Sequence, residues 1–135
     1  MGLSSRFPGP MAPLESESIF TDGMICRVGA ANNKVRLPGG ASPTTALLGV
    51  IMRPDGSACA AGDTVDVLLG GAYPLVAGGA ISRGDFVTSG GADGTVITET
   101  AAAGTNVAVV GQALEDAAAG ERVLCTINPF IKQGG

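Results

Sequence analysis

The chain is 135 residues long, the size of one domain with its own hydrophobic core, and its 22 glycines and 8 prolines favour many turns and few long helices. It contains no histidine, so the usual general base and the commonest metal ligand are absent, and we expect neither an enzyme nor a bound metal or other cofactor. With 8 basic and 12 acidic residues, a net charge of −4 and no basic cluster, a nucleic-acid partner is not expected either.

Residues 1–17 differ in composition from the rest of the chain and are expected to form an extended N-terminal arm. The prolines hold the backbone extended and remove amide donors, so this segment is expected to stay outside the central strands of the domain. An extended segment with spaced apolar side chains suits docking along a partner. The candidate binding residues are therefore Phe7, Pro8, Pro10, Met11, Pro13 and Leu14.

From residue 18 to residue 130 the sequence consists of short β-like runs between turn residues, which predicts a single all-β domain. The expected architecture is a small compact barrel or sandwich with short strands and glycine-rich turns. The runs are SIFT, MICRV, TALLGVIM, TVDVLL, AYPLV, DFVTS, TVITE, NVAVVGQAL and RVLCTIN. Only Ala113–Gly120 has helical propensity, enough for one or two turns at most. Residues 131–135 are expected to form a flexible C-terminal tail.

One turn unit recurs along this domain. Leu47–Leu69 aligns with Val109–Ile127, with Gly49 opposite Gly111. The shared unit is a glycine, an acidic residue, one variable residue and a valine. Its instances begin at Gly62-Asp63, Gly84-Asp85 and Gly120-Glu121. We expect the glycine to take a left-handed turn conformation, the acid to accept hydrogen bonds from free backbone N–H groups, and the valine to start the buried face of a strand.

The second instance contains Arg83-Gly84-Asp85, a tripeptide that also serves as a cell-adhesion signal. Because Gly84-Asp85 occupies the same place as the other two Gly-acid pairs, the turn is the favoured interpretation. Glycine-rich stretches at residues 39–45 and 90–94 lack the Lys-Ser/Thr of a phosphate-binding loop, and no Asp-x-Asp-x-Asp spacing indicates calcium. We therefore expect no catalytic residues.

The cysteines and the apolar runs bear on the compartment. Cys26, Cys59 and Cys125 are widely spaced and form no Cys-x-x-Cys pair, which predicts reduced thiols in a cytoplasmic product. No run of 18 apolar residues exists, and the N-terminus lacks the apolar core of a signal peptide. A membrane partner is therefore not expected.

Four strand-and-turn motifs follow one another within residues 47–127. They are Gly71–Val76, Ile81–Val87, Ala92–Gly94 and Gly111–Val123. This order resembles the small head decoration, or capsid cement, proteins of tailed bacteriophages. The resemblance implies a structural virion protein that is made in the host cytoplasm. It would be placed as a homotrimer, or sometimes a monomer, at three-fold or quasi-three-fold positions on the outer capsid surface. There it would bridge neighbouring major capsid proteins, which become the expected partner of the arm residues. Residues 32–46 match nothing in this pattern.

Two other interpretations stay open. One is a different accessory β-module of a virion, on a tail or spike. The other is a cellular β-barrel binding domain of the swivelling or carrier kind, in which Gly-Asp-x-Val turns also recur. A carrier domain needs a modifiable lysine at a hairpin tip, and Lys34 and Lys132 lie outside any clear hairpin tip.

Overall fold

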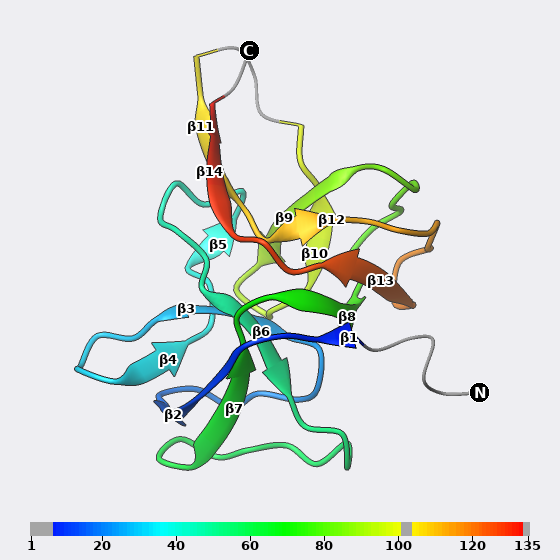
Figure 1. Ribbon diagram of the computed structural model, residues 1–135. Helices are drawn as coiled ribbons and strands as arrows, with labels where there is room; N and C mark the ends of the chain where they lie inside the picture. Colours follow the sequence, from blue (N-terminus) through cyan, green and yellow to red (C-terminus); the bar gives the residue numbers. More distant parts are fainter. Residues whose placement is uncertain (1–6, 101–103, 134–135) are drawn as a thin grey trace.

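The computed structural model describes residues 7–100 and 104–133, and over these ranges the chain consists of strands, turns and loops (Figure 1). The predicted all-β class is confirmed, with a closed barrel at its centre. Ala113–Gly120 is not helical: Ala113 and Ala117 instead form isolated bridges to Cys125 and Ile81. Within the described ranges, no helix has the length and apolar character that crossing a membrane requires.

The strands form a barrel and three smaller sheets. The closed barrel, in the lower half of Figure 1, runs in the order β2 (Met11–Ser16), β4 (Lys34–Arg36), β3 (Ile25–Val28), β6 (Gly49–Met52) and β7 (Thr64–Leu68). Above it, one sheet pairs β8 (Gly71–Val76) with β1 (Phe7–Pro8) and β13 (Arg122–Thr126). Another pairs β9 (Phe86–Gly91) with β5 (Gly40–Ala41), β10 (Val96–Thr98) and β12 (Gly111–Gln112). The last is a two-stranded ribbon of β11 (Asn106–Val109) and β14 (Phe130–Gln133).

Two hydrophobic clusters share the barrel strands. Neighbouring residues of a strand point to opposite faces, and in β6 Val50 belongs to one cluster and Ile51 to the other. The first cluster joins the outer side of the barrel to β8, β9 and β13, and includes Tyr73 and Val123. The second fills the barrel and includes Phe20. A strand buried on both faces reads as a continuous apolar run, which is why LLGVIM shows no polar alternation.

Strand β2 overturns the expectation that the proline-rich segment stays outside the central strands of the domain, because it pairs on both sides. It pairs antiparallel with β7 from Met11 to Glu15 and parallel with β4 at Glu15 and Ser16. The amide of Glu15 donates to Asn33 on the β4 side. Pro13, two residues earlier, faces that same side, where β4 has not yet begun. The missing N–H of Pro13 therefore removes no ladder bond to β7, and proline is tolerated at such an open edge.

The C-terminal segment also differs from its expectation over part of its length. Ile131, Lys132 and Gln133, expected in a flexible tail, pair with Ala108, Val107 and Asn106 of β11. In Figure 1 the resulting ribbon rises away from the other sheets at the top of the view. Residues 1–6 and 134–135 lie outside the described residues.

The aligned glycines Gly49 and Gly111 have the same structural role in the two copies of the repeat. A Cβ on Gly111 would lie 1.7 Å from the backbone oxygen of Thr126, and one on Gly49 would lie 2.1 Å from the backbone oxygen of Leu68. Leu68 and Thr126 stand three residues after the valine of their respective turn units. The repeat therefore includes a close backbone approach that admits no side chain.

A buried carboxylate joins the barrel to the sheet above it. Asp22, which is 8% exposed, accepts hydrogen bonds through Oδ1 from the hydroxyl of Tyr73 and the amide of Arg53, each at 2.7 Å. Its Oδ2 pairs with the guanidinium of Arg122 at 2.9 Å. Because these partners come from β8, from the end of β6 and from β13, one side chain ties together both halves of the molecule.

Candidate functional site

The three Gly-acid turns share one geometry. Gly62, Gly84 and Gly120 have φ values of 97°, 94° and 87°. The acidic side chain that follows each glycine accepts the backbone N–H three residues before it, at 2.8 Å for Asp63, 3.0 Å for Asp85 and 2.7 Å for Glu121. The valines that follow, Val65, Val87 and Val123, are at most 1% exposed. Each turn is therefore followed by a strand whose valine side chain is buried in the core.

Alanine at any of these glycines is expected to destabilise the protein by about 1 kcal/mol, because a Cβ at positive φ meets its own backbone. No other atom lies within 4 Å of the added Cβ at Gly62, Gly84 or Gly120, so the cost is conformational alone. Urea unfolding of Gly84→Ala measures it. Gly84→Asn is the control, since asparagine tolerates this conformation and should lose clearly less stability. Equal losses for both variants would contradict the explanation.

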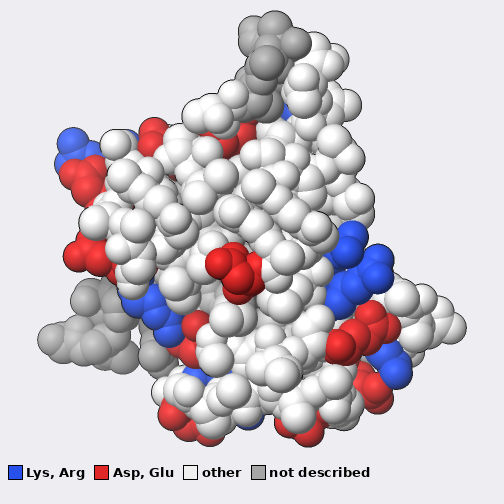
Figure 2. Space-filling model, turned by 180° about the vertical axis from the view of Figure 1, so that it is seen from behind, with Lys and Arg blue, Asp and Glu red and all other residues white. Residues whose placement is uncertain are grey.

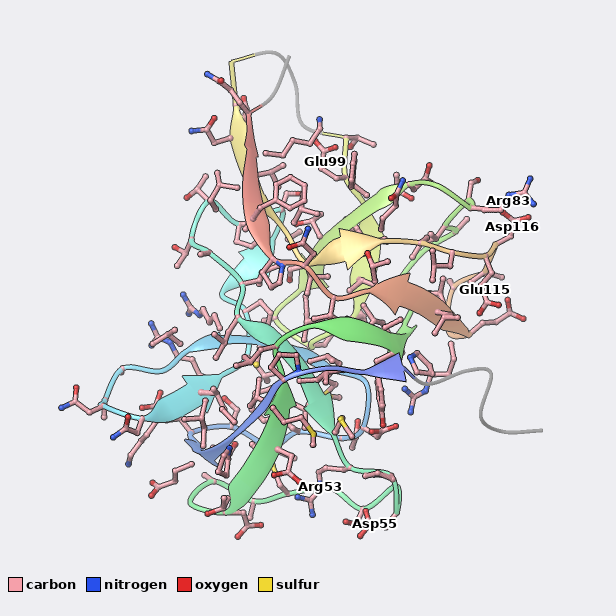
Figure 3. All side chains as sticks on the ribbon, in the orientation of Figure 1. Arg53, Asp55, Arg83, Glu99, Glu115 and Asp116 are labelled. Atoms are coloured by element: carbon pink, nitrogen blue, oxygen red, sulfur yellow. The ribbon has the colours of Figure 1, made fainter. Side chains whose placement is uncertain are left out.

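Within the Arg83-Gly84-Asp85 turn, the carboxylate is already engaged. Asp85 Oδ2 accepts the amide of Ser82 at 3.0 Å and the hydroxyl of Thr98 at 2.9 Å. The amide of Arg83 donates to Asp116 at 2.7 Å, and Figure 3 shows Arg83 and Asp116 side by side at one end of the molecule. These contacts have the geometry of a structural turn, whereas an adhesion signal would need the Asp85 carboxylate to be available.

The candidate binding residues of the N-terminal segment are divided by the structure. Phe7 and Pro8 form β1, paired with Ala72 and Gly71 of β8. Pro10, Met11 and Pro13 are exposed, Met11 at 51%. Leu14 instead packs against the cluster inside the barrel. Met11 and Pro13 of β2, with Pro10 directly before the strand, therefore form a short exposed apolar strip, which we call the β2 strip (Pro10, Met11 and Pro13).

A second apolar area lies on the β11–β14 ribbon and was not among the candidates. The rings of Phe86 and Phe130 meet edge to face with centroids 5.7 Å apart, yet both residues are 38% exposed, and Ile131 is 43% exposed. Lys132 reaches the largely buried carboxylate of Glu99 at 3.2 Å. In the sequence, only the apolar pair Phe130-Ile131 indicates this area, and the expected boundary between domain and tail falls between these two residues.

Charged side chains are unevenly spread over the surface. Figure 2 shows a face whose middle is almost free of lysine, arginine, aspartate and glutamate, apart from one acidic group, with charges gathered at its edges. Depletion of charge at the centre, with a polar rim, is typical of protein–protein interfaces. This distribution suits contact with another protein better than contact with a polyanion.

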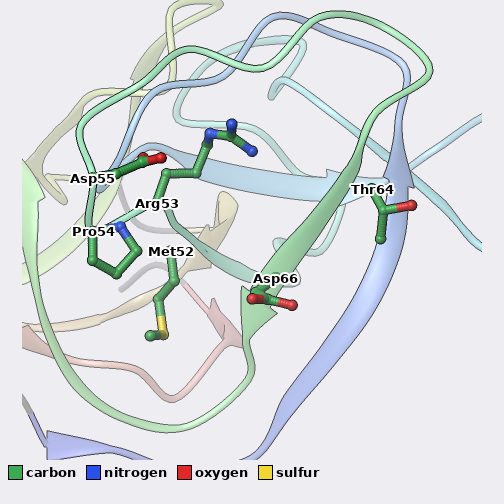
Figure 4. A pocket seen from close by; sticks show the side chains of 6 residues that line it. All are labelled: Met52, Arg53, Pro54, Asp55, Thr64 and Asp66. Atoms are coloured by element: carbon green, nitrogen blue, oxygen red, sulfur yellow. The ribbon is translucent and has the colours of Figure 1, made fainter.

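A hollow beside β6 and β7 is lined in part by charged side chains that are already hydrogen-bonded. It measures about 390 Å³ and is lined by Met52, Arg53, Pro54, Asp55, Thr64 and Asp66 (Figure 4). Both Arg53 and Asp55 are hydrogen-bonded to Ser57, and the bonds from Ser57 lower the pKa of Asp55. Among the described residues, no group of three or more cysteine and acidic side chains could hold a metal ion.

The thiols are free, as predicted, and all three are buried. Burial raises the pKa of Cys26 to about 12 and that of Cys125 to about 12. A thiol with such a pKa stays protonated at neutral pH and is a poor nucleophile. Cys26 and Cys125 therefore have a packing role in the folded protein.

Comparison with known proteins gives a family and a fold. The family model described as phage cement protein matches residues 21–128. The solved structure of the head fiber gp8.5 N base of bacteriophage phi29 is similar in fold, with a TM-score of 0.62 and 22% sequence identity over 88% of this chain and 93% of that chain. No curated protein matches the chain.

Proposed function

The chain belongs to the phage cement protein family, and from this premise we propose that it decorates the outside of a phage head and stabilises the capsid by bridging neighbouring major capsid proteins. The observation that carries the proposal is the extent of the family match, which spans all of the barrel except β2 and most of the sheets above it. The role is structural rather than enzymatic, since bridging needs only matched surfaces, many copies and a stable body.

We infer that the protein acts as a homotrimer at three-fold or quasi-three-fold positions. The β11–β14 ribbon supports this, because a two-stranded ribbon is marginal by itself and this one carries exposed Phe130 and Ile131. Packing such ribbons around a symmetry axis would cover their apolar side chains. Analytical ultracentrifugation of the free protein, together with cryo-electron microscopy of decorated heads, tests the inference. A monomer that sits away from every three-fold position would refute it.

The direct test of the function uses heads that lack this protein. Purified protein added to such heads should sediment with them in fixed stoichiometry, and decorated heads should retain their DNA at a higher temperature than bare heads. A role as an accessory module of a tail or spike is the alternative, and immunogold labelling separates the two by location. Label on tails, or no sedimentation with heads, would contradict the proposal.

We further propose that the β2 strip, with Phe7 and Pro8 of β1, contacts the major capsid protein. Met11→Asp should weaken binding to bare heads about tenfold, because a charge would enter an apolar contact, while thermal unfolding should stay unchanged since the side chain is 51% exposed. Leu114→Asp is the matched control: Leu114 is 45% exposed and lies on the turn next to Glu115 and Asp116. Equal affinity of both variants would remove the β2 strip from the interface.

A further inference from the structure

Two arginines stand opposite each other on the outside of the barrel. Arg27 of β3 and Arg36 of β4 are paired residues in an antiparallel ladder. Their neighbours Cys26 and Val35 are fully buried in the cluster that fills the barrel, so Arg27 and Arg36 project outward. Like charges directly opposite each other on two strands are destabilising. The pairing of Arg27 with Arg36 therefore does not stabilise the free protein.

Among the described residues, no acidic side chain forms an ion pair with either arginine. The ion pairs join Lys34 to Glu15, Arg122 to Asp22 and Lys132 to Glu99. The negative charge of Glu17 acts on Arg36, but the Glu17 carboxylate is hydrogen-bonded to backbone amides.

The carboxylate of Glu17 accepts the amides of Ala30 at 2.9 Å and Ala31 at 3.1 Å. The bond from Ala30 is the main reason why the pKa of Glu17 is lowered, and the charge of Arg36 contributes less. Glu17 thus fixes the turn between β3 and β4, and the guanidinium of Arg36 is left without a direct acidic partner among the described residues.

The two guanidinium groups are nevertheless placed for a ligand. Arg27 Nε donates to the backbone oxygen of Leu37 at 3.1 Å, and a Cβ on Gly39 would lie 3.0 Å from a guanidinium nitrogen of Arg27, so this group lies flat against the backbone. The Nε of Arg36 is buried and has no hydrogen-bond partner. Buried donors in native proteins nearly always have an acceptor. Because the Nε of Arg36 is buried and that of Arg27 is bonded to Leu37, a ligand from another protein would bind the Nη groups, which have no hydrogen-bond partner among the described residues.

We propose that Arg27 and Arg36 together bind a carboxylate of the major capsid protein, the side chain of an aspartate or glutamate on its outer surface. This inference rests on the proposed function. Guanidinium groups bind carboxylates through paired hydrogen bonds, which are stronger than bonds between neutral groups. Lys34 offsets the charge of Glu15, whereas the negative charge of Glu17 remains near Arg36 and favours a singly charged ligand over a polyanion.

The test replaces both arginines by glutamine (Arg27→Gln with Arg36→Gln) and measures affinity for bare heads at low and at high salt. We expect binding at least tenfold weaker at low salt and a smaller salt dependence, with thermal unfolding no lower than in the unchanged protein, because repulsion between the two charges is removed. The Arg27→Lys, Arg36→Lys variant keeps both positive charges but loses the planar guanidinium groups that form paired hydrogen bonds. It should bind with intermediate affinity. Arg83→Gln is the control, since it removes one exposed positive charge elsewhere. Double-glutamine protein that binds as tightly as Arg83→Gln would overturn the inference.

If the unchanged protein binds no heads, the proposed function fails and the arginine pair is tested separately. In the free protein, the side-chain Nε–H signals of Arg27 and Arg36 should shift in NMR spectra on addition of a hexaglutamate peptide, and that of Arg83 should not. Equal shifts at all three arginines, or shifts with inorganic phosphate alone, would overturn the carboxylate assignment. The double-glutamine variant could also change its oligomeric state while its affinity for heads stays the same. That result would place the carboxylate on a second copy of this chain and would refute the inference.

Discussion

Gly111→Ala should destabilise the protein by about 3 kcal/mol or more, enough to lower its unfolding temperature by roughly 10 °C. The added Cβ would lie 1.7 Å from the backbone oxygen of Thr126, far inside contact distance. Since the obstacle is backbone rather than a flexible side chain, β12 and β13 must separate to admit the methyl group. Differential scanning calorimetry measures the shift.

The repeat supplies a second copy of this experiment and the sheets supply a control. Gly49→Ala places a Cβ 2.1 Å from the backbone oxygen of Leu68 and should be nearly as damaging. Gly40→Ala, in β5, meets no atom within 4 Å and should change stability little. If Gly111→Ala unfolds at the same temperature as Gly40→Ala, the close approach is not what holds the glycine there.

Asp22→Ala is expected to cost about 3 kcal/mol of folding free energy, because it removes the acceptor of two buried hydrogen bonds, from the Tyr73 hydroxyl and the Arg53 amide, and the ion pair with Arg122. Chemical denaturation gives the value. The loss should be a change in midpoint without a change in slope, since both core clusters still unfold together.

Two single substitutions apportion that loss. Tyr73→Phe removes one donor and should cost about 1 kcal/mol. Arg122→Ala should cost about 1 kcal/mol or less, because its side chain is 44% exposed and its ion pair is partly screened by water. An Asp22→Ala variant no less stable than Arg122→Ala would show that the surface ion pair, rather than the buried hydrogen bonds, accounts for the role of Asp22.

The sequence was most informative where a local rule determines the outcome. Positive φ at a Gly-acid turn and burial of the valine after it follow from neighbouring residues alone, and the structure places Gly84, Asp85 and Val87 accordingly. Strand alternation in RVLCTI likewise places Val123 and Cys125 on one side, and both are fully buried. The all-β class followed from the density of such units.

The sequence was least informative where distant pairing decides. Three prolines predicted that residues 1–17 would stay outside the central strands of the domain. Which amides of a strand must donate, however, depends on where its neighbouring strands begin and end. Pro13 faces the side on which β4 pairs only from Glu15 onward, and nothing within residues 1–17 reveals this. The pairing of Arg27 with Arg36 was likewise hidden, because register between strands separated by a turn is set by the packing of the barrel.

The place of β2 in the barrel determines the order in which the chain can fold during synthesis. Met11 leaves the ribosome early, but its partner Leu68 lies on β7, so the barrel closes only after that later strand has emerged. The sheet above waits longer still, since β8 pairs with β13 near the end of the chain. Residues 11–15 must therefore remain unpaired until β7 has emerged. Prolines suit that interval, because each proline interrupts the row of amide donors and makes the nascent segment a poorer template for pairing with other unfinished chains.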